Sequence, residues 1–236
     1  VYKRQNIQFF KQKLGGKVVI LSIDAEEFGN LYTVYTAIKH VDPPFLIAMS
    51  DHIFEYRILQ KLLSLPSEKA FTICLDRKPS LSEANEGLKV KLSDGKIIEV
   101  GKNTESRFGI DTGLIIVREK AQRYIREVVE EKGPNVTIGE ALDRAAKEGE
   151  VDYVDVTGLL WKDIDTPEDL LEARKIYKRI NLRDYGSKII SLPTRLLVRP
   201  ITSGLASRLN KGSAPRAVFA SSLLTLLVFS LRENTS

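Results

Sequence analysis

The chain has 236 residues, of which 43% are hydrophobic and 28% charged. This composition excludes wholesale disorder and allows one large α/β domain with an appendage. One cysteine, Cys74, and two histidines exclude a disulfide framework, a cysteine-based zinc site and histidine-rich metal binding. The net charge is +5, but the charges are unevenly distributed along the chain. Residues 1–173 carry 24 basic and 29 acidic side chains, whereas residues 174–216 carry 11 basic side chains and one acidic side chain. The basic tail predicts a phosphate-bearing partner: nucleic acid, anionic lipid or a phosphorylated substrate.

Both ends of the sequence look cut. The only methionine is Met49, and residues 1–5 (VYKRQ) match the translation of a common sequencing adapter, although a native basic N-terminus is the alternative. Residues 217–231 form an uncharged, mostly apolar run of 15. A spanning helix needs ~20 residues. Because the run follows a basic stretch, we expect a shortened transmembrane helix rather than a buried core helix.

The first half of the chain alternates apolar strand patterns with helix patterns. Gly15 and Gly16 end the first helix and Pro66 ends the third. The alternation predicts a parallel sheet covered by helices on both faces. We expect helices at 6–14, 33–39 and 55–65, and strands at 17–23, 45–49 and 71–75.

The second half changes pattern. A tight Asp94-Gly95 turn predicts a hairpin of 88–92 with 96–100. Thr137 and Glu140 have capping-box spacing, and Thr166 followed by Pro167 and two acids opens the last helix. We expect strands at 113–117 and 151–156, and helices at 119–131, 137–147 and 166–178.

Two acidic motifs are candidate metal sites. The stretch Ser50-Asp51-His52 directly follows the apolar strand FLIAM, and ligands of open α/β sheets bind beyond the carboxyl ends of strands. Asp163 and Asp165 lie two residues apart before a capped helix, where their like charges favour a cation between them. Magnesium that holds nucleotide phosphates suits both places. The alternative for Asp51 and for Asp165 is helix N-capping.

From about Lys17 to Tyr177 the chain resembles the sugar-phosphate nucleotidyltransferases in the order of its motifs. These motifs are the strand FLIAM followed by Asp51, the hairpin, Asp111-Thr112-Gly113, and W-x-D-x-x-T before a helix. The resemblance implies a nucleotide-diphospho-sugar-transferase-like (Rossmann-like) α/β fold, a mixed sheet with helices on both faces. It also implies catalytic Mg2+ on Asp51 and Asp163.

The resemblance implies further site residues. Lys102 would contact the sugar phosphate, although Gly-Lys stands here where Glu-Lys-Pro is usual. Asp111, Thr112 and Gly113 would contact the polyol ring. Gly29 and Asn30 would contact the nucleotide, with a plain turn glycine as the alternative for Gly29. Glu140 matches a ring-hydroxyl ligand, with helix capping as its alternative.

The Gly-rich loop that cradles the triphosphate in this family is not found in residues 1–30. Gly15-Gly16-Lys17 lies between a helix and a strand, not after a strand. We therefore expect the sequence to start inside the nucleotidyltransferase domain, which would occupy residues 6–179, and to be inactive by itself.

The tail narrows the resemblance. Residues 181–209 interleave Leu and Ile with arginines, as a basic amphipathic segment on an anionic membrane does, while a solvated linker is the alternative. With this tail, the chain resembles bifunctional enzymes that join a CTP:inositol-1-phosphate cytidylyltransferase to a membrane CDP-alcohol phosphatidyltransferase, the di-myo-inositol-phosphate-phosphate synthase. Residues 180–236 would begin that second, membrane domain as a helical segment. The aspartate cluster of the phosphotransferase is absent from the sequence.

This resemblance implies CTP and inositol phosphate as substrates, a position on the cytoplasmic face of the cell membrane, a homodimer through the membrane domain and a thermophilic source. One Met, one Cys and five Gln agree with a hot habitat. Nucleic acid is not expected, because the tail has too few aromatic side chains for base stacking. The alternatives are another sugar-1-phosphate nucleotidyltransferase, for mannose or glucose 1-phosphate, and a non-catalytic, membrane-recruited nucleotide-binding module.

Overall fold

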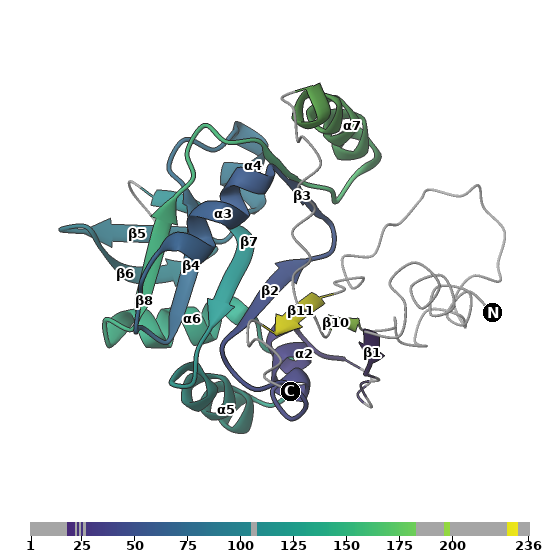
Figure 1. Cartoon of the computed structure of the whole chain (residues 1–236). Helices are drawn as coiled ribbons and strands as arrows, with labels where there is room; N and C mark the ends of the chain where they lie inside the picture. The colour runs from purple at the N-terminus through teal and green to yellow at the C-terminus, as the bar shows by residue number, and fades with distance from the viewer. Residues whose placement is uncertain are drawn as a thin grey trace, which may run out of the picture.

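A computed structural model describes residues 18–21, 23, 25, 27–104, 108–182, 196–198 and 226–230. These residues form a twisted central sheet flanked by helices, with a small two-stranded sheet beside it (Figure 1). The helix expected at 6–14 and the adapter-like residues 1–5 lie outside the described residues.

The central sheet has the order β1-β10-β11-β2-β7-β4-β8, and the β5–β6 hairpin extends it beside β7. The described pairs are antiparallel except β1 with β10 and β4 with β8, which are parallel. The mixed sheet is therefore confirmed, whereas the purely parallel sheet suggested by the alternating pattern is wrong, because β7 runs against both of its neighbours. The strands are β1 (Val18–Ile20), β2 (Phe45–Met49), β4 (Phe71–Asp76), β5 (Lys89–Ser93), β6 (Lys96–Gly101), β7 (Phe108–Val117), β8 (Val151–Asp155), β10 (Leu196–Val198) and β11 (Leu226–Ser230).

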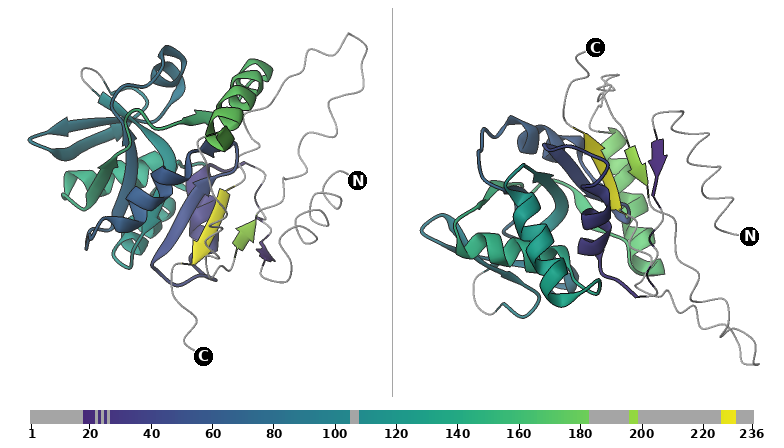
Figure 2. Two further views of the ribbon diagram at one scale, coloured as in Figure 1. Left: turned by 45° about the horizontal axis from the view of Figure 1, so that its top comes forward. Right: turned by 90° about the horizontal axis from the view of Figure 1, so that it is seen from below.

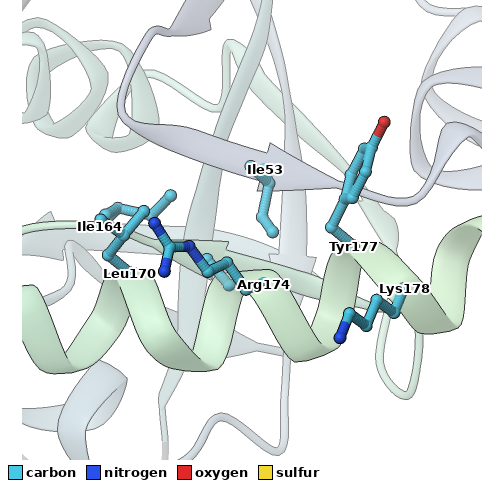
Figure 3. A pocket seen from close by; sticks show the side chains of 7 residues that line it. Ile53, Ile164, Leu170, Arg174, Tyr177 and Lys178 are labelled. Atoms are coloured by element: carbon cyan, nitrogen blue, oxygen red, sulfur yellow. The ribbon is translucent and has the colours of Figure 1, made fainter.

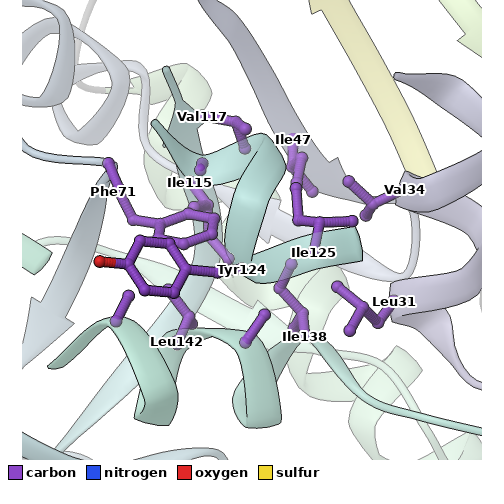
Figure 4. Close-up of a cluster of buried hydrophobic side chains, with 14 of the residues drawn as sticks. Leu31, Val34, Ile47, Phe71, Ile115, Val117, Tyr124, Ile125, Ile138 and Leu142 are labelled. Carbon is purple, nitrogen blue, oxygen red and sulfur yellow. The ribbon is translucent and has the colours of Figure 1, made fainter. Parts of the chain in front are cut away.

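Helices cover both faces of the sheet, as expected (Figures 1 and 2). Along β2 the side chains alternate: Phe45 and Ile47 join the core under α2, α5 and α6, while Leu46 and Ala48 join the core under α3. Figure 4 shows the first of these cores, in which Tyr124 of α5 packs against Phe71. The helices are α2 (Asn30–Ala37), α3 (Tyr56–Ser64), α4 (Leu81–Glu86), α5 (Ala121–Lys132), α6 (Ile138–Lys147) and α7 (Pro167–Leu182).

Local turn and cap signals act as the sequence predicts. Asp94 (φ +50°) and Gly95 (φ +74°) both adopt left-handed backbone, which closes the β5–β6 hairpin. At the start of α6, the Glu140 carboxylate accepts hydrogen bonds from the backbone N–H of Thr137 at 2.7 Å and from its hydroxyl at 3.1 Å. Thr166 caps α7 through the N–H of Asp169 at 3.1 Å.

The tail departs from expectation. Residues 226–230, predicted as part of a membrane helix, form β11, which pairs antiparallel with β2 from Leu226 opposite Met49 to Ser230 opposite Phe45. β10 pairs with β11 on its other side. The prediction of a helical tail separate from the domain is therefore wrong for these two strands. β2 needs a hydrogen-bonding partner on its side away from β7, and a Leu- and Val-rich run suits that place. Within the described residues, none of the helices is both long and apolar enough to cross a membrane.

Candidate functional site

The two predicted metal-binding aspartates meet at a small antiparallel sheet beside the end of β2. This sheet pairs β3 (His52–Phe54) with β9 (Trp161–Asp163) and places His52 opposite Asp163. The N–H of Ile164 donates to the carbonyl of Asp51 at 3.0 Å, which extends the pairing by one step. Asp51 and Asp163 therefore converge as predicted, but through the β3–β9 pairing and not because two strands of the central sheet end side by side.

The convergence is tight enough for a shared cation. One ligand atom from each of Asp51, His52 and Asp163 lies within 4.8 Å of the other two. The His52 Nε2 is 3.3 Å from Asp163 Oδ1 and 3.7 Å from Asp51 Oδ1. Both of these carboxylate oxygens are buried and have no hydrogen-bond partner among the described residues. Buried polar atoms are usually paired, so this arrangement needs a cation, a proton or water at that place.

The histidine offsets part of the negative charge of the cluster. Burial disfavours the charged imidazole of His52, but the nearby Asp163 carboxylate, the carbonyl of Thr112 and the charge of Asp51 together raise its pKa to about 9. Burial raises the pKa of Asp51, against the lowering effect of His52, and the charge of Asp163 raises it further. At neutral pH an imidazolium therefore lies between two carboxylates whose like charges repel.

The Asp111-Thr112-Gly113 stretch supports the histidine from β7. The His52 Nδ1 lies 2.8 Å from the carbonyl of Thr112, which accepts its proton. Gly113 has φ +81°, and a Cβ there would lie 2.6 Å from His52 Nδ1 and 2.8 Å from Met49 Cγ. The β4–β7 register shifts opposite this point. Gly113 is thus needed both for the left-handed backbone and for the close approach of the imidazole.

The side chains of Asp111 and Thr112 are buried beneath the cluster. Asp111 is 7% exposed, and its Oδ1 has no hydrogen-bond partner among the described residues. Burial raises its pKa to about 7, although backbone hydrogen bonds from Gly113 and Thr112 and the nearby charge of His52 lower it. The role of these two residues in binding a polyol stays a prediction.

Three polar contacts fix the strand that carries Asp163 and the residue before it. The Trp161 indole N–H donates to Asp76 Oδ2 at 2.9 Å, and the N–H of Leu160 donates to Glu55 Oε2 at 3.1 Å. Lys162, a residue only 4% exposed, pairs through its ammonium group with Asp169 of α7 at 2.8 Å. These contacts tie β9 to β4, to the loop before α3 and to α7, so they hold the Asp163 carboxylate in a defined position.

The capping alternatives for the acidic motifs fail. Asp51 is followed by β3, and α3 begins later at Tyr56 with Glu55 in the cap position. At α7 the cap is Thr166, not Asp165. Burial and the charges of Asp163 and Asp51 raise the pKa of Asp165, so it lies within the field of the cluster without joining it.

Other predicted residues lie elsewhere in the described contacts. Gly29 lies at the start of α2, and a Cβ there would lie 1.9 Å from the Val136 carbonyl oxygen. The Asn30 side chain accepts a hydrogen bond from the N–H of Ile138 at 2.7 Å. Both residues join α2 to the start of α6, which gives them a structural role. No hydrogen bond or ion pair among the described residues links them to the carboxylate cluster.

Glu140 and Lys102 also lie outside the cluster. Glu140 caps α6 and pairs with Lys132 at 3.0 Å, so both of its carboxylate oxygens already have partners. Lys102 is exposed in the turn after β6 and makes no ion pair with the described residues. Binding roles for these residues stay predictions.

His52 is the site residue that the sequence reasoning missed. It is not among the candidate residues of the sequence analysis, because two histidines in the chain argue against histidine-based metal chemistry. The available signal was electrostatic: two converging carboxylates need a positive group, and a histidine next to one of them can supply it.

The cluster fits a divalent cation. Two carboxylate oxygens converge, are buried and lack other partners, and carboxylates are the protein ligands that Mg2+ prefers. Asp51 and Asp163 would hold the ion, and His52 and Asp165 would lie beside it.

Comparison with known proteins agrees with the resemblance found in the sequence. No protein-family model matches the chain. The chain is 28% identical over 225 residues to the bifunctional IPC transferase and DIPP synthase of Aquifex aeolicus, covering 95% of this chain and 48% of that protein. The enzyme of the same name from Rubrobacter xylanophilus is 33% identical over 144 residues, which is 60% of this chain and 32% of that protein. The chain thus spans about half or less of the length of these relatives.

Solved structures show the same fold. The inositol-1-phosphate CTP transferase of T. maritima superposes with a TM-score of 0.66 at 20% identity, covering 76% of this chain and 73% of that one. A Bacillus anthracis structure assigned as a glucose-1-phosphate thymidylyltransferase superposes with a TM-score of 0.59 at 16% identity, covering 78% and 74%. These similarities confirm the nucleotidyltransferase-like fold expected from the sequence.

Proposed function

We propose that this chain carries the nucleotidyltransferase part of a bifunctional enzyme that converts CTP and inositol 1-phosphate to CDP-inositol and pyrophosphate. The names of the curated relatives and of the T. maritima structure support this assignment. The whole enzyme would also make di-myo-inositol-phosphate phosphate.

The observation that carries the proposal is the convergence of two buried oxygens, one from Asp51 and one from Asp163, that accept no hydrogen bond from the described residues and have only the His52 imidazole beside them. In the reaction, a phosphate oxygen of inositol 1-phosphate forms a bond to the α-phosphorus of CTP. The bond from that phosphorus to the bridging oxygen of the β-phosphate breaks, and pyrophosphate leaves with the electron pair. Bound Mg2+ would neutralise phosphate charge. The protein contributes positioning and electrostatic stabilisation, which supply most of the catalysis in such transfers.

The other residues implied by the resemblance keep their places in this proposal. Lys102 neutralises the acceptor phosphate, and Asp111 to Gly113 face the polyol. Gly29 and Asn30 contact the nucleotide, and Glu140 contacts a ring hydroxyl. In the full-length protein we place the domain on the cytoplasmic face of the cell membrane, as a homodimer held through the membrane part.

The test uses the full-length protein that contains these residues, with CTP, inositol 1-phosphate and Mg2+, and detects CDP-inositol and pyrophosphate. Wild type and Asp165→Asn should turn over, whereas Asp163→Asn should lose at least ~100-fold in rate while staying folded, as loss of electrostatic stabilisation predicts. Full activity of Asp163→Asn would refute the site.

A panel of nucleotides and sugar phosphates separates the alternatives. If the enzyme prefers glucose or mannose 1-phosphate, that sugar phosphate is the acceptor in place of inositol 1-phosphate, and the reaction is still a nucleotidyl transfer. Nucleotide binding without product for any pair would favour the non-catalytic module and would overturn the proposed activity.

A further inference from the structure

Helix α7 exposes an apolar stripe that the nucleotidyltransferase chemistry does not use. Leu170, Leu171 and Tyr177 are 43%, 56% and 59% exposed, and they are three of the six large apolar side chains found exposed in the described residues. Arg174 and Lys178 are exposed within the same stripe and make no ion pair with a described residue. At about 100° per residue, these five side chains fall on one face of the helix. We call them the α7 stripe.

A groove lies beneath the α7 stripe. It has a volume of about 660 Å3 and is lined by the helix together with Ile53 of β3 and Ile164, which follows β9. Figure 3 shows Ile53 across from Leu170, Arg174 and Tyr177. The floor is therefore apolar, while the charged groups come from the helix. Exposed apolar surface of this kind, next to cations, marks an interaction site.

The charges of α7 change sign along the helix. Its acidic residues, Glu168, Asp169 and Glu172, lie in the first two turns and point away from the α7 stripe, and Asp169 is neutralised by Lys162. Residues 174–179 add four basic side chains, and the sequence after the helix stays basic. Residues 1–173 are net acidic. An anionic surface would thus attract the C-terminal part of α7 and repel the rest of the domain.

We propose that the α7 stripe docks the domain onto an anionic lipid surface. Leu170, Leu171 and Tyr177 enter the boundary between headgroups and acyl chains, and Arg174 and Lys178 pair with lipid phosphates. This interface lies in the folded domain, before the basic tail that the sequence predicts as the membrane contact. A second copy of the chain is a poorer occupant, because two stripes facing each other would bring like charges together. The proposal does not depend on the catalytic assignment.

The basic tail can bind vesicles by itself, so the test must report on the helix. The whole chain carries Leu171→Cys labelled with an environment-sensitive fluorophore, since the native Cys74 is buried and its thiol pKa is raised by burial. Leu81→Cys, at the most exposed of the large apolar side chains that the structure describes, is the matched control. Phosphatidylcholine vesicles with and without phosphatidylglycerol are the probe.

The label at residue 171 should shift to the blue with phosphatidylglycerol vesicles only, and the label at residue 81 should not. Arg174→Glu with Lys178→Glu should weaken this response at least ~10-fold, given about 1 kcal/mol per basic residue at an anionic surface. The matched reversal of two cations elsewhere, Lys96→Glu with Arg126→Glu, should not.

Three results would overturn the proposal. The first is sedimentation with vesicles while the label at residue 171 stays in water, which would assign binding to the tail alone. The second is an equal loss in the two charge-reversal pairs. The third is a blue shift that depends on protein concentration without vesicles, which would identify the α7 stripe as an interface between copies of the chain.

Discussion

Replacing Gly113 with alanine tests how the metal-binding cluster is held together. A non-glycine residue in left-handed backbone costs roughly 1–2 kcal/mol. At Gly113 the new Cβ would also lie 2.6 and 2.7 Å from two atoms of the His52 ring and 2.8 Å from Met49 Cγ. Overpacking of this kind costs about 1–3 kcal/mol. The imidazole cannot swing away freely, because the Thr112 carbonyl and Asp163 hold its two nitrogens. We expect Gly113→Ala to lower the free energy of unfolding by roughly 2–5 kcal/mol.

Gly95→Ala is the matched control, because Gly95 has a similar φ of +74° and a Cβ there would meet nothing within 4 Å. It should cost only the backbone strain, roughly 1–2 kcal/mol. Urea unfolding of the purified chain measures both losses, and Mn2+ binding followed by electron paramagnetic resonance reports on the cluster. Gly113→Ala should weaken Mn2+ binding and Gly95→Ala should not. Equal unfolding losses together with unchanged Mn2+ affinity would refute the argument that His52 packs over Gly113.

Three further predictions concern the same cluster. Asp163→Asn should lower Mn2+ affinity by at least ~10-fold, and Asp165→Asn, which removes charge but no converging oxygen, should lower it less; titration of both variants decides this. In the metal-free protein the His52 pKa of about 9 exceeds its ordinary value of 6.5, so the protonated imidazole stabilises the folded state by up to roughly 3 kcal/mol. This contribution to the free energy of unfolding should be complete below about pH 6.5 and lost as the pH rises through about 9. His52→Gln should lack this loss in urea unfolding, and a wild-type stability that is flat from pH 7 to about 10 would contradict the raised pKa. Trp161→Phe should cost about 1–3 kcal/mol by leaving a carboxylate oxygen of Asp76 without its donor, and should weaken Mn2+ binding by loosening β9.

Elements with a strong local signal could be predicted from the sequence. The strand at Phe45–Met49 has the observed bounds, because a short apolar run before a polar turn has few other structures open to it. The hairpin follows from Asp94-Gly95, since two left-handed residues are needed for its turn. The cap of α6 follows from the spacing of Thr137 and Glu140.

Strand direction and very short strands could not be predicted. The composition of a strand does not depend on the direction in which it runs. The hydrophobic pattern of the sequence therefore could not show that β7 lies antiparallel between β2 and β4. β3 and β9 have three residues each, too few to show a period of two. The pairing of β11 with β2 joins residues far apart in sequence, and its apolar run suits a membrane helix as well as a strand.

The same limit explains what was and was not seen of the site. Asp51 and Asp163 were found because each stands in a motif, but their convergence depends on β3 meeting β9, a contact between residues 111 positions apart at His52 and Asp163. That pairing also places the imidazole between the two carboxylates, so the position of the positive group is a property of the sheet and not of either motif. Motifs therefore identify which side chains carry charge, whereas the β3–β9 register decides which opposite charge they meet. For this reason a substitution that loosens β9, such as Trp161→Phe, is expected to affect metal binding although it removes no ligand.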